Sequence, residues 1–151
     1  MNILVLATLS HAGSDGTLIT EPTVLVLSDL PDSAFPNQTH PSAVVVVPAG
    51  WDSTPPIDVV AYVHGWDNCV QNIVLSGPTG SACETPRQKN AYNLTAQFLA
   101  SKTNALLLAV EVRFVANSSD PGRFAVPGDF AVFLTAALRQ VTNRTIPLSQ
   151  I

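Results

Sequence analysis

The chain has 151 residues, a length that suits one domain with a core of useful size. Apolar residues make up 46% of it and charged residues only 12%, and the formal net charge is −4. An acidic chain without a cluster of Lys or Arg is a poor partner for nucleic acid or an anionic membrane. No apolar run approaches the roughly 18 residues of a membrane span. We therefore expect neither nucleic-acid binding nor membrane insertion.

The N-terminal stretch 1–16 has two interpretations. A short apolar run over residues 3–9 is followed by the small residues Ser10 to Gly13, so the stretch is either a signal-peptide remnant or a first strand. Residues 17–151 are expected to form a single α/β domain.

Two further features favour a secreted or otherwise exported protein. Cys69 and Cys83 are the only cysteines and bracket one loop. We expect them to form a disulfide, and the alternatives are idle thiols or a nucleophilic Cys69 near His64. Four sequons offer candidate glycosylation sites, at Asn37, Asn93, Asn117 and Asn143.

Several apolar segments predict strands, and two segments predict helices. The strands are expected over 3–9, 17–27, 44–47, 57–63 and 105–110. Because these runs do not alternate, we expect both faces of the sheet to be covered. Thr85, Pro86 and Gln88 predict the start of a helix that continues past Leu99.

The second helix is expected to begin near Asp129 and to end before Pro147. Its apolar residues recur at helical spacing. They are Phe130, Phe133, Leu134, Ala137, Leu138 and Val141. The order of strands and helices predicts an α/β fold, a three-layer sandwich with a mostly parallel central sheet.

One stretch points to chemistry. The apolar run 57–63 breaks at His64-Gly65 and turns polar over Trp66, Asp67 and Asn68. In α/β sheets, functional loops gather beyond the carboxyl ends of strands. The structural alternative is a simple turn glycine beside a histidine that binds local backbone groups.

This stretch resembles the third strand and following loop of the α/β-hydrolase superfamily, in particular secreted esterase- or lipase-like members. The resemblance covers roughly residues 43–143 and implies that the loop after His64-Gly65 supplies a backbone N–H of the oxyanion hole. The implied substrate is a small-molecule ester, with no cofactor.

The nucleophile elbow that such a hydrolase needs, Gly-x-Ser-x-Gly, occurs nowhere in the chain. Gly13-Ser14-Asp15-Gly16 resembles the elbow in residue types but lacks its strand–turn–helix context. We therefore expect the N-terminal portion of a hydrolase, inactive by itself. The alternatives are a non-catalytic secreted α/β binding module and a pseudo-hydrolase.

Glu111 and Arg113 follow the most apolar strand and are expected at the rim of a pocket. The alternative is an ion pair or a solvated strand end. The three histidines lack partners at ligand spacing, so no metal site is predicted. Strand 57–63 is expected to pair with 105–112 on one side only, and its open side predicts self-association.

Overall fold

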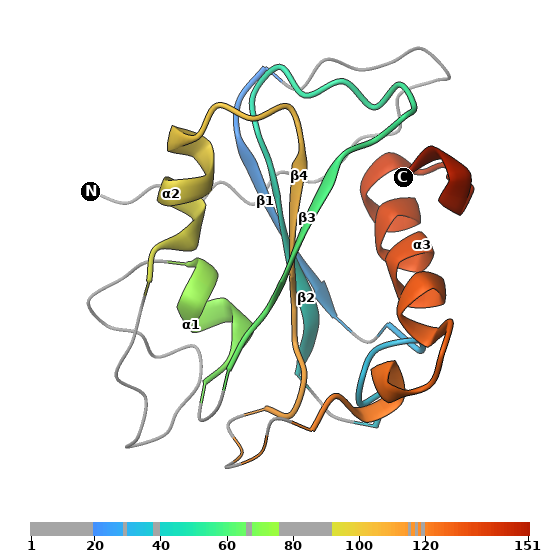
Figure 1. Cartoon of the computed structure of the whole chain (residues 1–151). Coiled ribbons are helices and arrows are strands. Elements are labelled where there is room, and N and C mark those ends of the chain that lie inside the picture. Colours follow the sequence, from blue (N-terminus) through green and yellow to red (C-terminus); the bar gives the residue numbers. More distant parts are fainter. Residues whose placement is uncertain are drawn as a thin grey trace.

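The described part of the chain forms one four-stranded sheet with helices on both faces (Figure 1). The computed structural model describes residues 20–28, 30–37, 40–65, 68–75, 92–114, 116, 118 and 120–151. The strands are β1 (Thr23–Ser28), β2 (Pro41–Val47), β3 (Val59–Val63) and β4 (Leu106–Val110). The helices are α1 (Val70–Val74), α2 (Leu94–Ala100) and α3 (Asp129–Thr142), with 3₁₀ turns η1 (Gly122–Ala125) and η2 (Leu148–Gln150).

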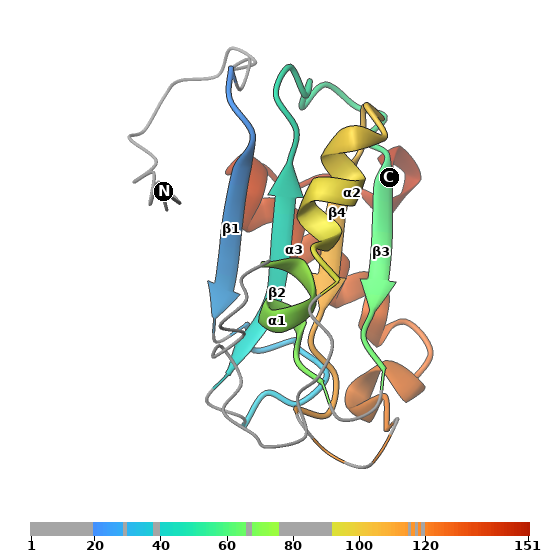
Figure 2. The ribbon, with the colours of Figure 1, turned by 90° about the vertical axis from the view of Figure 1, so that its left-hand side faces the viewer.

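The strands lie in the order β1-β2-β4-β3 (Figure 2). β2 is antiparallel to both of its neighbours, and only β3 and β4 run parallel. The predicted sandwich with a mostly parallel sheet is therefore wrong, because this small mixed sheet is mostly antiparallel. Unbroken apolar runs show that both faces of a strand are covered, but they do not fix its direction.

Two apolar clusters lie on the two faces of the sheet, and β2 and β4 contribute to both. Val45 and Leu108 belong to the cluster under α3, whereas Val44 and Leu107 belong to the cluster under α1 and α2. All four side chains are almost fully buried. This alternation explains why β2 and β4 are apolar at nearly every position.

The prediction for α3 is confirmed over Asp129–Thr142. Its predicted apolar stripe packs on the sheet, with Phe133, Ala137 and Leu138 fully buried. Asn143 ends the helix in a left-handed conformation, and its backbone N–H donates to the Arg139 carbonyl.

The first predicted helix is shorter than expected where the structure describes it. Tyr92 and Asn93 are not helical, and the Asn93 side chain caps α2 by accepting a hydrogen bond from the Ala96 N–H at 3.2 Å. The predicted start at Thr85 lies outside the described residues. Helix α1, with five residues, was not predicted at all.

A tight contact joins the loop after β1 to η1. The Arg123 backbone N–H donates to the Ala34 carbonyl at 2.9 Å, and its guanidinium contacts Asp129 at 3.1 Å. Gly122 has φ +56°, and a Cβ on it would lie 2.2 Å from the Ala34 carbonyl oxygen. No larger residue fits at position 122 without moving this backbone.

Strand β3 is an edge strand, as the sequence predicted. Its one neighbour among the described strands is β4. Val60 and Val63 are 47% and 53% exposed, and no residue of β3 carries a charge. An uncharged, apolar edge with free backbone groups is a template for a further strand.

We expect a chain of residues 1–151 to self-associate through β3. Light scattering at roughly 100 μM should show dimers or larger species, because exposed strand edges associate in this concentration range. Val60→Lys should reduce the association by placing a charge on the edge. A matched Val26→Lys change on β1, the other edge strand, should leave it in place. A stable monomer of the unaltered chain would contradict the prediction.

No helix among the described residues is long and apolar enough to span a membrane. The stretch 1–16 lies outside the described residues, so both interpretations of it stay predictions.

Candidate functional site

His64 and Glu111 lie at the same edge of the sheet. His64 follows β3 directly and Glu111 follows β4 directly, and these two strands are paired in parallel. Parallel neighbours bring their carboxyl ends together, which is where functional groups gather in α/β sheets. The next residue, Gly65, is exposed, whereas His64 and Glu111 are only 5% and 6% exposed. The loop therefore begins with a buried imidazole and an open glycine.

The imidazole and the carboxylate form a buried pair. His64 Nε2 contacts Glu111 Oε1, and that oxygen makes no other hydrogen bond within the described part of the chain. The second oxygen, Oε2, accepts a hydrogen bond from the Val70 N–H at 2.9 Å. On the other side of the ring, His64 Nδ1 lies 2.8 Å from the Gly65 carbonyl oxygen. One carboxylate thus joins the ends of β3 and β4 to the first residue of α1.

The other end of the loop is also held by polar contacts. The Asn68 side-chain oxygen accepts from the Cys69 N–H at 3.0 Å and from the Asn72 side-chain amide at 3.1 Å. Asn68 and Asn72 are both buried. The two ends of the 64–70 loop are therefore fixed to the sheet and to α1.

The pKa of His64 is raised by its surroundings. Burial is the largest single influence and by itself lowers the pKa, because it penalises the charged ring. The hydrogen bond to Glu111, the negative charge of that carboxylate and the Gly65 carbonyl together outweigh burial and raise it. The site therefore favours a protonated imidazole.

A raised pKa predicts how stability changes with pH. The protonated ring stabilises the folded state fully below the unfolded pKa of 6.5, and this contribution is lost as pH rises through the higher folded pKa. The melting temperature should therefore fall as the pH rises through that range. Thermal melts of His64→Gln should lack this part of the decrease, and His40→Asn should retain it. A His64→Gln variant with the unaltered pH profile would contradict the assignment.

Comparisons with protein-family models, curated proteins and solved structures found no match for this chain.

The Glu111 carboxylate is almost closed to solvent, at 6% exposure. The cavity beside it, between His40, Ser42 and Val112, has a volume of only about 10 Å³, which is room for at most one water. The pair is thus enclosed by protein, and Glu111 is not placed to take a proton from a substrate. The geometry favours a role in holding the loop.

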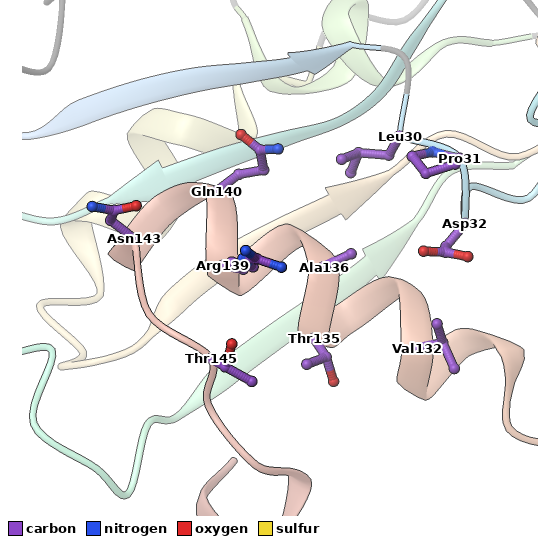
Figure 3. Close-up of a pocket in the computed structure, with 10 residues that line it drawn as sticks. All are labelled: Leu30, Pro31, Asp32, Val132, Thr135, Ala136, Arg139, Gln140, Asn143 and Thr145. Carbon is purple, nitrogen blue, oxygen red and sulfur yellow. The ribbon is translucent and has the colours of Figure 1, made fainter.

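A larger hollow of about 680 Å³ lies elsewhere, on the face of α3 that borders residues 30–32 (Figure 3). Arg139, Gln140 and Asn143 line one end, and Val132 and Asp32 lie at the other. It is an open groove, and none of the residues expected at the oxyanion loop or its rim lines it. We therefore do not assign the chemistry to it.

The second predicted rim residue, Arg113, does not contact the His64–Glu111 pair. Its side chain is half exposed, 3.9 Å from Asp120 and above the Phe35 ring. Glu111 pairs with His64 and Arg113 pairs with Asp120, and the expected place of both residues at a pocket rim stays a prediction. Trp51, the other tryptophan, is buried in the core.

Several predicted residues lie outside the described part, namely Trp66, Asp67, Cys83 and Asn117. No cysteine of the described part is free, and Cys69 begins α1 with its sulfur 3.5 Å from the Asn72 N–H. The bridge from Cys69 to Cys83 stays a prediction. No group of three or more potential metal ligands occurs among the residues that the structure describes.

The candidate glycosylation sites differ in their surroundings. Asn37 and Asn143 are exposed, whereas Asn93 is half-buried and its side-chain oxygen caps α2. Glycosylation at any of these sites stays a prediction.

Sequence reasoning missed Val70 and Val112 as partners of the pair. Both act through backbone N–H groups, with the Val112 N–H 3.2 Å from His64 Nε2. Almost every residue type has a backbone N–H, so the residue types at positions 70 and 112 do not indicate this role. Only the strand order could have indicated it.

Proposed function

We propose that this chain carries the oxyanion-hole portion of an α/β-hydrolase-like serine esterase, whose nucleophile, acid and base come from further polypeptide. The observation that carries the proposal is the pair of anchored loop ends, His64-Gly65 at the carboxyl end of β3 and Asn68 before α1. An oxyanion hole needs backbone N–H groups whose orientation does not change during the reaction. The buried Glu111 at the end of the neighbouring strand supports that rigidity.

Gly65 supports the proposal independently. No described atom beyond its chain neighbours lies within 4 Å of the place where a Cβ would stand, and its φ lies outside the left-handed region. Neither backbone conformation nor local packing therefore requires glycine here. A glycine is also used where a ligand must approach the backbone closely. The absence of described atoms around the Cβ position leaves the Gly65 backbone accessible to a ligand.

The open edge of β3 is consistent with a site whose nucleophile comes from a further strand. The loop that would bind the oxyanion lies at the end of an edge strand. A strand added at that edge in parallel would bring its own carboxyl end next to His64 and Gly65. The missing nucleophile would then lie beside the oxyanion donors, as the resemblance implies.

The test uses the longest reading frame that contains residues 1–151. We expect it to encode a strand followed by Gly-x-Ser-x-Gly, and the product should hydrolyse short-chain nitrophenyl esters. Gly65→Ala should lower kcat/KM by about 10²–10³-fold, because a methyl group would crowd the oxyanion. The melting temperature should not change, since the added Cβ meets no described atom.

Gly50→Ala is the control, because Gly50 lies in another loop and its added Cβ also meets nothing within 4 Å. It should leave kcat/KM unchanged. A reading frame without the serine elbow, or full activity of Gly65→Ala, would refute the proposal.

We further expect purified 1–151 to show no turnover of nitrophenyl esters above buffer. The chain has no serine elbow, and its buried His64–Glu111 pair is closed to substrate. Turnover by purified 1–151 clearly above buffer would contradict this prediction.

A further inference from the structure

We infer that Glu111 is the positioning residue at the start of the oxyanion loop, acting through the ring of His64 to fix the direction of the Gly65 carbonyl. The role of Glu111 in hydrolysis rests on the proposed function. The contacts among Glu111, His64 and Gly65 are independent of that proposal. It assigns a second role to a residue that the sequence placed at a pocket rim.

The first step concerns the proton on His64 Nδ1. This nitrogen lies 2.8 Å from the Gly65 carbonyl oxygen, which can only accept a hydrogen bond. If Nδ1 carried no proton, its lone pair would face the lone pairs of the Gly65 carbonyl oxygen, and the two acceptors would repel each other. Nδ1 must therefore carry a proton.

The second step concerns Nε2, which has two partners of opposite kind. Glu111 Oε1 is an acceptor when ionised, and the Val112 N–H at 3.2 Å is a donor. A protonated ring satisfies the carboxylate, whereas a neutral ring with its proton on Nδ1 accepts from Val112. Both states keep the proton on Nδ1, so the bond to the Gly65 carbonyl survives titration of the pair.

The third step concerns what holds the ring in place. Glu111 is itself fixed, because its Oε2 accepts from the Val70 N–H and its backbone N–H donates to the Ser42 carbonyl at 3.0 Å. A carboxylate with one oxygen held by the Val70 N–H, on a backbone bonded to Ser42, can set the plane of an imidazole in a buried site. Histidine orientation is set in this way by the group bound to its second nitrogen.

The last step concerns the Gly65 carbonyl. Its bond to the His64 ring holds the backbone of Gly65 in one orientation. The resemblance places the oxyanion donor just beyond His64-Gly65, in the loop that Gly65 begins. Losing the His64 bond would free the Gly65 carbonyl to rotate.

Two substitutions of His64 separate the two nitrogens. In His64→Asn, the amide can replace Nδ1–H and still donate to the Gly65 carbonyl, whereas His64→Gln reaches toward Glu111 and lacks that donor. We expect the carbonyl ¹³C shift of Gly65 in labelled 1–151 to stay near its original value in His64→Asn and to move in His64→Gln. Equal shifts in both variants would overturn the inference.

Two substitutions of Glu111 test the other end. The side-chain amide introduced by Glu111→Gln can accept from the Val70 N–H and donate to His64 Nε2, so this variant should preserve the Nδ1 proton. Glu111→Leu can do neither, and amide exchange at Val70 should rise by at least about tenfold. A Glu111→Gln variant that behaves like Glu111→Leu would show that hydrogen bonding at this position does not hold the ring, and would overturn the inference.

The unaltered protein tests the protonation of His64 Nδ1 even if the variants do not fold. In its ¹⁵N–¹H spectrum, His64 Nδ1 should carry a proton on both sides of the ring's titration. A ring with a proton on Nε2 alone would overturn the inference. These readouts need no hydrolysis, so they stay valid if the esterase proposal fails, and an inactive enzyme with the expected spectrum would refute only that proposal.

Discussion

Glu111→Ala should lower the free energy of unfolding by about 3–5 kcal/mol, the range found when one partner of a buried ion pair is removed. The change leaves the His64 ring buried without its carboxylate and the Val70 N–H without its acceptor. Both groups are costly to leave unsatisfied in a site closed to water. Urea unfolding followed by circular dichroism measures the loss.

The control for this change is Arg113→Ala, two positions further along the chain. Arg113 and Asp120 form an ion pair 3.9 Å apart in which both side chains are about half exposed. Exposed pairs contribute about 0–1 kcal/mol, so this variant should unfold close to the unaltered protein. Similar losses in the two variants would show that the His64–Glu111 pair does not stabilise the fold as the structure indicates.

Gly122→Ala should also be strongly destabilising, by about 2–5 kcal/mol, from two effects that add. A left-handed residue with a Cβ is strained, and the new methyl group would overlap the Ala34 carbonyl and the Phe35 ring. The Cβ would come within 2.2 Å of the carbonyl oxygen and 2.8 Å of the ring. The same contact holds the loop after β1 against η1 through the Arg123 N–H. The midpoint of urea unfolding should therefore shift markedly.

Gly50→Ala separates the two effects. Gly50 also has a positive φ, +76°, but a Cβ there would meet nothing within 4 Å. Only the backbone strain applies, and the expected loss is about 1 kcal/mol. Equal losses at the two glycines would mean that the loop after β1 moves aside without cost.

The sequence predicted the elements that carry a local signal. Helix α3 was predicted closely because its apolar residues keep one helical face, and its six stripe residues all pack on the sheet. Helix α1 was missed because it has only five residues, and its cap is Cys69, a residue type without a strong capping preference. Short helices depend on tertiary contacts, here the one from the Val70 N–H to Glu111.

Strand direction and the centre of the site depend on contacts that the sequence does not contain locally. The valines of β2 are buried on both faces, which fits a parallel or an antiparallel strand equally well. His64 and Glu111 were each singled out, one for the loop and one for a rim. Their contact follows only once β3 and β4 are known to be parallel neighbours.

The position of β4 also has a consequence for how the chain folds. β4 is the last of the described strands to be synthesised, yet it lies between β2 and β3 in the finished sheet. Its pairing with β2 joins Val45 to Leu108, about 60 positions apart, so a long loop must close before this contact stabilises anything. β1 and β2 can pair early, but the inner edge of β2 then stays open on the ribosome. Proteins with such distant pairings fold slowly and are exposed to aggregation meanwhile. The insertion of β4, rather than helix formation, should therefore set the folding rate.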